Sequence, residues 1–365
     1  MEYNTNPIAT IGAAFLAFYG YTTRAARRVM ASGPDSDTMA SNGQPDAPGN
    51  KAGDHDNGVP DAPTSRYEPT VIDVLITKAM LIKALALPRE IVDAIIDLAG
   101  YWPHTTVERE YGDNKIVARG SYASGENVFL ARSPPLGMSR WSPVHSNKIY
   151  PPPAIRLPKP QRPGDEFSPD DFQKVVSSPT GLLAHPCRRI VFTIRSRDQG
   201  WGGQWGDRGT YNGSWTWFEV GLERWCKNSP STQQEQQQDQ KQQLPSLSVD
   251  DLCTVIPQVQ EQNGEATFVH PLLPSPDLKI QGNVTADNEV REHQVVWSYT
   301  DDIDPERDIE AAQRLGEQGR GRATGTGNFV RDLRLGDVVT MWAKARFPGW
   351  ANHCEYVRMD VYYAV

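Results

Sequence analysis

The sequence predicts a mainly β protein. We expect an antiparallel β-sandwich of the jelly-roll or galactose-binding-like kind, preceded by a small helical hairpin and a disordered N-terminus. Three observations predict this order. Residues 1–65 are mostly polar, residues 66–104 show helical periodicity, and short alternating segments with glycine turns follow over 105–365.

The first 65 residues do not predict a packed domain. Their apolar segment at 8–21 is shorter than the roughly 20 residues that a membrane span needs. A secretory signal would have a basic residue before its apolar segment, and this chain has none there. Residues 31–65 are rich in Gly, Pro, Asp, Asn and Ser, which predicts a linker. We expect a cytoplasmic protein, with membrane association through residues 8–28 as the alternative.

Two helices are predicted next. Residues 71–86 have the length and apolar density of a helix, and residues 89–99 place apolar side chains on one face. Pro88 suits the first turn of the second helix, and Gly100 suits its end. Together they predict a helical hairpin whose apolar faces need a partner.

The start of the second helix resembles the opening helix of an F-box. The matching residues are Leu87, Pro88, Glu90, Ile91, Ile95 and Ile96. The resemblance implies that these residues bind the linker subunit of a cullin ubiquitin ligase, while a second domain presents substrates. The alternative is a hairpin that packs on the β domain. The short motif leaves both open.

Alternating apolar and polar residues predict the strands. We expect them at 114–118, 127–131, 189–195, 214–220, 295–299, 338–347 and 356–363. Two surface insertions interrupt them. One is Gln-rich at about 228–244, and the other is charged at about 301–322 with a short helix at 305–315. The glycine-rich residues 319–327 predict a flexible turn that leads into a strand.

The Trp-rich segment at 195–219 is the main candidate for binding. Its glycines allow tight turns, and its tryptophans supply large, rigid contact surfaces. In the strand at 338–347, alternation places Val339 and Met341 in the core and Trp342 with Arg346 on the opposite, exposed side. The alternative is that these tryptophans are core residues.

Flat aromatic rings beside hydrogen-bonding groups suit a sugar, whose ring faces are apolar and whose rim is polar. We therefore expect a protein or glycan ligand. The candidate ligand-binding residues are Asp198, Trp201, Trp205, Arg208, Trp342, Arg346, Trp350 and His353.

Charge and residue spacing limit the remaining functions. A net charge of -8 argues against a nucleic-acid partner. The four cysteines show no paired spacing, which predicts buried free thiols in a reducing compartment. The histidines and serines show none of the spacings that are typical of metal sites or catalytic centres, so we expect no metal, no cofactor and no enzyme activity. Asp198 and Glu219 are the alternative, as paired carboxylates of a carbohydrate-active enzyme; carboxylates beside turns more often cap backbone amides.

Three blocks resemble a domain of uncharacterised proteins in filamentous fungi. They are residues 198–219, 325–337 and 342–350, and the Leu-Pro-x-Glu helix fits the same family. The resemblance implies no activity. From the residues themselves we expect a non-enzymatic binding module with a protein or glycan ligand. A ubiquitin-ligase adaptor and a carbohydrate-active enzyme are the alternatives.

Overall fold

The computed structural model describes residues 68–112, 116–121, 125–137, 157–162, 164–165, 185–226 and 251–365. The chain divides into two units, Met1–Thr64 and Ser65–Val365, and every element below belongs to the second. The predicted apolar segment at 8–21, the linker at 31–65 and the Gln-rich insertion lie outside the described residues. Within the described ranges, no helix combines the length and apolar character needed to cross a membrane.

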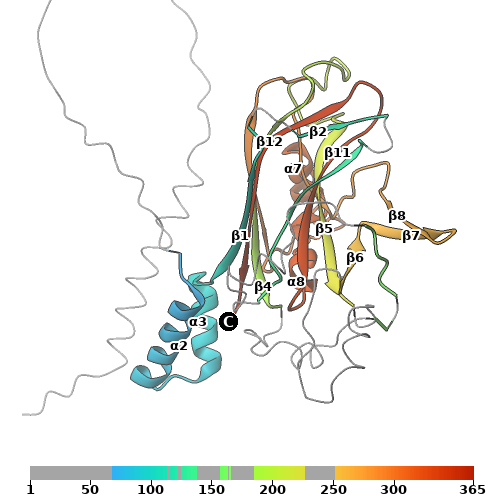
Figure 1. The fold of residues 1–365 in the computed structure, drawn as a ribbon. Helices are drawn as coiled ribbons and strands as arrows, with labels where there is room; N and C mark the ends of the chain where they lie inside the picture. The colour runs from blue at the N-terminus through green and yellow to red at the C-terminus, as the bar shows by residue number, and fades with distance from the viewer. Residues whose placement is uncertain are drawn as a thin grey trace, which may run out of the picture. The chain divides into compact units, whose positions relative to one another are not determined.

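The predicted helical hairpin is confirmed. Helix α2 spans Val71–Leu85, and helix α3 spans Arg89–Ala99 (Figure 1). The Thr70 side chain accepts a hydrogen bond from the Asp73 amide, and the Asp73 side chain accepts one from the Thr70 amide, so a capping box begins α2. Gly100 ends α3 with a φ of 59°, a left-handed conformation that glycine adopts without strain.

The rest of the unit is an antiparallel β-sandwich, as predicted (Figure 1). The first sheet has the strand order β1–β12–β4–β10, and β2 also pairs with β12. Its strands are β1 His104–Glu110, β2 Ile116–Arg119, β4 Cys187–Arg197, β10 Arg291–Ser298 and β12 Ala351–Tyr363.

The second sheet has the strand order β3–β11–β5–β6, and β9 also pairs with β5. A separate two-stranded hairpin consists of β7 and β8. The strands are β3 Asn127–Arg132, β5 Thr216–Trp225, β6 Leu252–Ile256, β7 Gln258–Gln262, β8 Glu265–Val269, β9 Lys279–Gly282 and β11 Val338–Ala345.

The core lies between the two sheets. Phe192 of β4, Phe218 of β5 and Met341 of β11 are all completely buried in it. The prediction that Val339 and Met341 face the core is confirmed. Aromatic and aliphatic side chains from both sheets therefore stabilise the sandwich by removing apolar surface from water.

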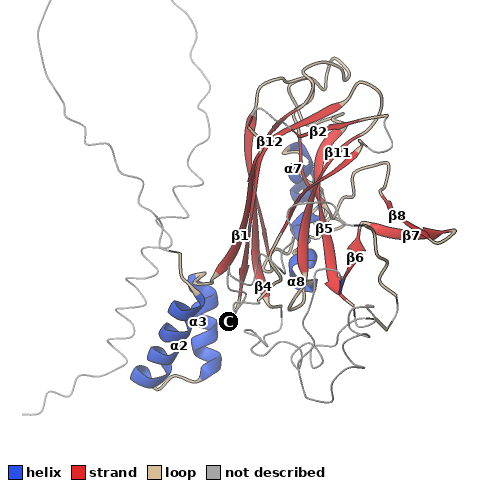
Figure 2. Ribbon diagram, viewed as in Figure 1, coloured by secondary structure: helices blue, strands red, loops and turns tan. Residues whose placement is uncertain are grey.

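The connection between β10 and β11 confirms one prediction and corrects another (Figure 2). The short helix expected within the insertion at 301–322 is α7, Ile309–Glu317, which exposes Ile309 and buries Ala312 and Leu315. The glycine-rich residues form a 3-10 turn, Thr324–Thr326, and lead into helix α8, Asn328–Asp332, rather than directly into a strand. Val330 of α8 joins the core, so packing orders this segment.

The hairpin is fixed to the sandwich by polar contacts. Asp97 of α3 accepts two hydrogen bonds of 3.0 Å from Arg188, and one of 2.8 Å from the Trp102 indole. The Lys78 ammonium of α2 donates to the Val365 carbonyl. The packing alternative for the hairpin is thus observed.

Candidate functional site

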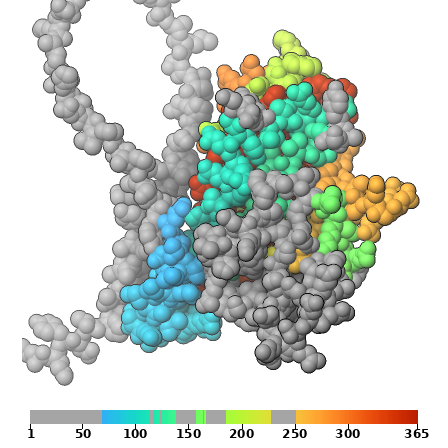
Figure 3. All heavy atoms as spheres, viewed as in Figure 1, coloured from blue at the N-terminus to red at the C-terminus, as the bar shows by residue number. Residues whose placement is uncertain are grey.

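The loop that joins β4 to β5, residues 198–215, lies at one end of the sandwich. We call it the tip loop. It protrudes beside the β9–β10 and β11–β12 connections (Figure 3). The Gly209 amide donates to the Thr285 carbonyl, and the Thr285 amide donates back to the Thr210 carbonyl. The Gln199 side chain accepts from the Ala351 amide at 3.0 Å. Hydrogen bonds thus fix the tip loop to both neighbours.

Asp198 holds this loop from inside. Its carboxylate is completely buried and accepts hydrogen bonds from the amides of Gly200, at 2.6 Å, and Ala286, at 2.7 Å. Burial raises the pKa of Asp198, and the amide hydrogen bonds oppose that rise. This geometry matches the capping alternative and makes Asp198 a residue that positions the loop.

Two glycines shape the tip. Gly200 has a φ of 86°, and a Cβ placed on it would lie 2.8 Å from the Asn288 Cβ. A Cβ on Gly349 would lie 2.7 Å from the Trp201 ring. Only glycine fits this approach, so the indole of Trp201 packs directly on the β11–β12 turn.

The tip loop nevertheless exposes large aromatic surface. Trp205 is 86% exposed and Trp201 is 59% exposed. The Arg208 guanidinium carbon lies 5.5 Å from the centre of the Trp205 ring, which is within cation–π range. Phe347 is also exposed and meets Trp215 edge-to-face, with ring centres 4.5 Å apart. These rings form one aromatic end of the molecule.

Trp350 and His353 are half-buried. Trp350 lies beside the tip loop, because a Cβ on Gly202 would be 3.7 Å from its ring. His353 lies within β12, in register with Arg197 of β4. The structure thus places Trp205 beside Arg208 on the tip loop, and packs the tip loop and the β11–β12 turn together at Trp201 and Trp350.

No protein-family model, curated protein or solved structure matches the chain. The site is therefore interpreted from its geometry alone. Within the described ranges, no cluster of His, Cys, Asp or Glu side chains is arranged to hold a metal ion.

The predicted exposed side of β11 is wrong. Trp342 is 4% exposed and Arg346 is 2% exposed. A covering segment, residues 268–275, lies over them. The rings of Phe268 and His270 lie 5.3 and 5.1 Å from Trp342, and Arg346 donates to the Pro271 carbonyl at 2.8 Å. Strand alternation identifies two faces but cannot show that a segment distant in the sequence covers the second.

Glu219 is buried beneath the same covering segment. It accepts hydrogen bonds from the Trp217 indole at 2.8 Å and the Ser275 amide at 3.0 Å, and it pairs with the buried ammonium of Lys344. Burial lowers the pKa of Lys344, and Glu219 opposes that shift. Burial also lowers the pKa of nearby Lys279 to about 8. Both carboxylates of the enzyme alternative are thus engaged by internal donors.

The cysteine prediction needs a correction. Cys226 and Cys253 form a disulfide, while Cys187 and Cys354 are free and buried, as predicted. The paired cysteines are 27 residues apart, and the antiparallel pairing of β5 with β6 brings their chain segments together. Sequence spacing could not reveal this neighbourhood.

The hairpin presents an apolar surface around the F-box-like residues. Ile91 is 50% exposed, Pro88 and Glu90 are exposed, and Leu87 and Ile95 are half-buried. The sequence did not indicate how much of α2 is exposed. Its exposed apolar side chains are Ile72, Leu75, Ile76, Met80, Ile82 and Leu85.

Proposed function

We propose that the protein is a non-enzymatic binding module that holds a glycan at the tip loop. The observation that carries this proposal is the exposure of Trp201 and Trp205 on a loop fixed by hydrogen bonds. Loops positioned by a rigid scaffold commonly carry binding residues. Because the backbone is already ordered, a ligand would meet little further entropic cost on binding.

The polar surroundings favour a glycan over an apolar ligand. Arg208, Gln204 and Asn212 are exposed around the indoles and supply hydrogen-bond donors and acceptors. A sugar ring can stack one face on an indole while its hydroxyls bond to such groups. A protein ligand, also expected from the sequence, is the competing outcome.

A glycan array probed with the full chain tests this proposal. Wild type should bind a defined set of glycans, and Trp205→Ala and Trp201→Ala should lose most of that signal. Arg307→Ala is the matched control, since its side chain is 87% exposed away from the tip. Signals that are equal for all four proteins, or absent for wild type, contradict the proposal.

A ubiquitin-ligase adaptor is the second candidate. The observation that favours it is the exposed apolar surface of α2 and α3 around Ile91. Surface of this kind on a monomer often marks a protein interface. The Cys226–Cys253 bond counts against it, since disulfides are rare where thiols are kept reduced. The same bond also argues against a cytoplasmic location. The cytoplasmic location expected from the sequence therefore stays an untested prediction.

Binding to the purified cullin linker subunit tests the adaptor candidate. Ile91→Asp should abolish the interaction. Ile309→Asp is the matched control, because Ile309 is 65% exposed on α7, outside the hairpin. If wild type does not bind, the exposed hairpin serves another partner and the adaptor candidate fails.

A further inference from the structure

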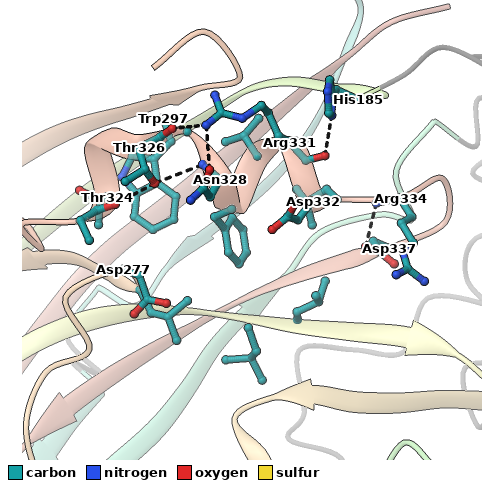
Figure 4. A pocket seen from close by; sticks show the side chains of 18 of the residues that line it. His185, Asp277, Trp297, Thr324, Thr326, Asn328, Arg331, Asp332, Arg334 and Asp337 are labelled. Carbon is teal, nitrogen blue, oxygen red and sulfur yellow. Dashed lines mark hydrogen bonds between the residues drawn. The ribbon is translucent and has the colours of Figure 1, made fainter. Parts of the chain in front are cut away.

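A large cavity lies against helix α8, and no residue of the tip loop lines it (Figure 4). Its volume is 1410 Å³. Its walls come from the end of β5, the loop before α7, and the segment that carries α8. A pocket of this size is large enough for a ligand of several residues, since small-molecule pockets span about 300–1,000 Å³.

The inner wall of the cavity is apolar. Leu222, Trp297 and Val330 line it and belong to the core between the two sheets. Phe329 also lines it and meets Trp297 edge-to-face, with ring centres 5.5 Å apart. The cavity therefore offers bulky apolar side chains a surface on which to be buried.

One donor on this wall lacks an acceptor. Trp297 is 1% exposed, and its indole Nε1 has no hydrogen-bond partner among the described residues. A buried indole N–H usually finds an acceptor, and leaving it unpaired costs about 1–3 kcal/mol. This nitrogen is enclosed by the protein, so Trp297 contributes apolar ring surface to the wall rather than an accessible donor.

Two guanidinium groups of the lining are already engaged. Arg331 donates to the carbonyls of Tyr299, at 2.7 Å, and Asp301, at 2.8 Å, and also to the Thr326 carbonyl. Arg224 donates to Asp337 at 2.9 Å, and the backbone amide of Arg334 donates to the same carboxylate (Figure 4). The charges of Arg331 and Arg224 are therefore held by the protein's own oxygens.

Most carboxylates of the cavity lining, by contrast, have no cation beside them in the part of the chain that the structure describes. The lining has six carboxylates against three guanidinium groups. Four of the six are exposed and have no ion-pair partner among the residues that the structure describes: Asp277, Asp302, Glu306 and Asp332. The rim thus attracts cations and repels anions.

We propose that this cavity binds an extended peptide segment of another protein that carries arginine or lysine beside bulky apolar residues. The apolar side chains bind the wall formed by Leu222, Trp297 and Phe329, and the cation lies at Asp302 and Glu306. This site is separate from the tip loop and does not depend on a glycan being bound there.

Fluorescence anisotropy with the full chain tests the proposal. The probe is a fluorescein-labelled octapeptide that alternates leucine and arginine, and the control peptide has glutamate in place of arginine. We expect saturable binding of the arginine peptide alone. The double variant Asp302→Asn, Glu306→Gln should weaken it about fivefold at low salt, and added salt should reduce that difference.

Matched variants locate the site. Glu310→Gln with Glu317→Gln removes two acidic groups of α7 outside the cavity and should leave the affinity unchanged. Trp205→Ala should also leave it unchanged. Trp297→Phe should weaken binding, with thermal unfolding measured to confirm that the variant is folded. Equal binding of both peptides, absence of binding, or loss only in the α7 control overturns the proposal.

Discussion

Replacing Glu219 by alanine tests whether the charges beneath the covering segment are structural. The side chain is 3% exposed and accepts from the Trp217 indole and the Ser275 amide in addition to the Lys344 ammonium. The substitution removes all three acceptor contacts. It leaves the Lys344 charge buried without its counterion. It also removes the negative charge that stabilises the protonated form of Lys279.

The expected loss is large. Removing one member of a buried ion pair typically costs 3–5 kcal/mol, because the remaining charge is desolvated and unpaired. We therefore expect Glu219→Ala to lower the free energy of unfolding by about 4 kcal/mol. Removing both charges, with Lys344→Met added, should cost less than the sum of the single changes, with a coupling of about 2 kcal/mol.

Urea unfolding followed by tryptophan fluorescence measures these values. Glu310→Ala is the matched control, because its side chain is 90% exposed and its ion pair with Arg314 lies on the surface. That variant should change stability by less than about 0.5 kcal/mol. A change below about 1 kcal/mol for Glu219→Ala, or full additivity with Lys344→Met, would refute the structural role.

Three further predictions follow from burial, protonation and the disulfide. Trp342→Ala should cost about 3–5 kcal/mol, whereas Trp205→Ala should cost less than about 0.5 kcal/mol; urea unfolding checks both, and equal costs contradict the assigned burial. Burial and the charges of Lys344 and Arg346 lower the pKa of His270 to about 3. The unfolded state then binds more protons below pH 6.5, so stability should fall from pH 6.5 toward 3, by up to about 1.4 kcal/mol per pH unit; His270→Gln should reduce this slope in pH-dependent unfolding. Reducing the Cys226–Cys253 bond, which closes a loop of 27 residues, should cost about 3.5 kcal/mol of chain entropy; a thiol titration with a melting curve checks this, and unchanged melting contradicts it.

Helices α2, α3 and α7 and most strands could be predicted because local signals determine them. Gly100 marks the end of α3, as expected from the left-handed conformation that glycine adopts there. The alternation in 338–347 identified the core side of β11 correctly. These signals come from neighbours in the sequence, so one chain is enough to detect them.

Strands β1, β6, β7, β8 and β9 were not predicted, and the other main errors concern contacts between distant segments. The covering segment buries Trp342 from more than sixty positions away, and pairing of β5 with β6 joins Cys226 to Cys253. Helix α8 follows a glycine-rich run whose order comes from packing against the core. The cavity beside α8 was not expected, because it is made of ordinary apolar and acidic residues from segments that are far apart in the sequence.

For the candidate site, the sequence identified the Trp-rich segment but not which indoles are exposed. Trp217 is completely buried, whereas Trp205, twelve residues earlier, is 86% exposed. Alternation places Trp217 on a strand but does not show whether the sheet face that carries its side chain is exposed. That depends on segments that are distant in the sequence. Composition alone cannot separate a core tryptophan from a ligand-binding one.

Isothermal titration calorimetry with the best glycan from the array tests the central claim most directly. Wild type, Trp205→Ala and Trp342→Phe would be compared with the same glycan. A binding role for the tip predicts that Trp205→Ala weakens affinity about thirtyfold or more, as expected for a tryptophan hot spot. It predicts that Trp342→Phe, if still folded, binds within about twofold of wild type. Unchanged affinity in Trp205→Ala, or loss only in Trp342→Phe, would contradict the account.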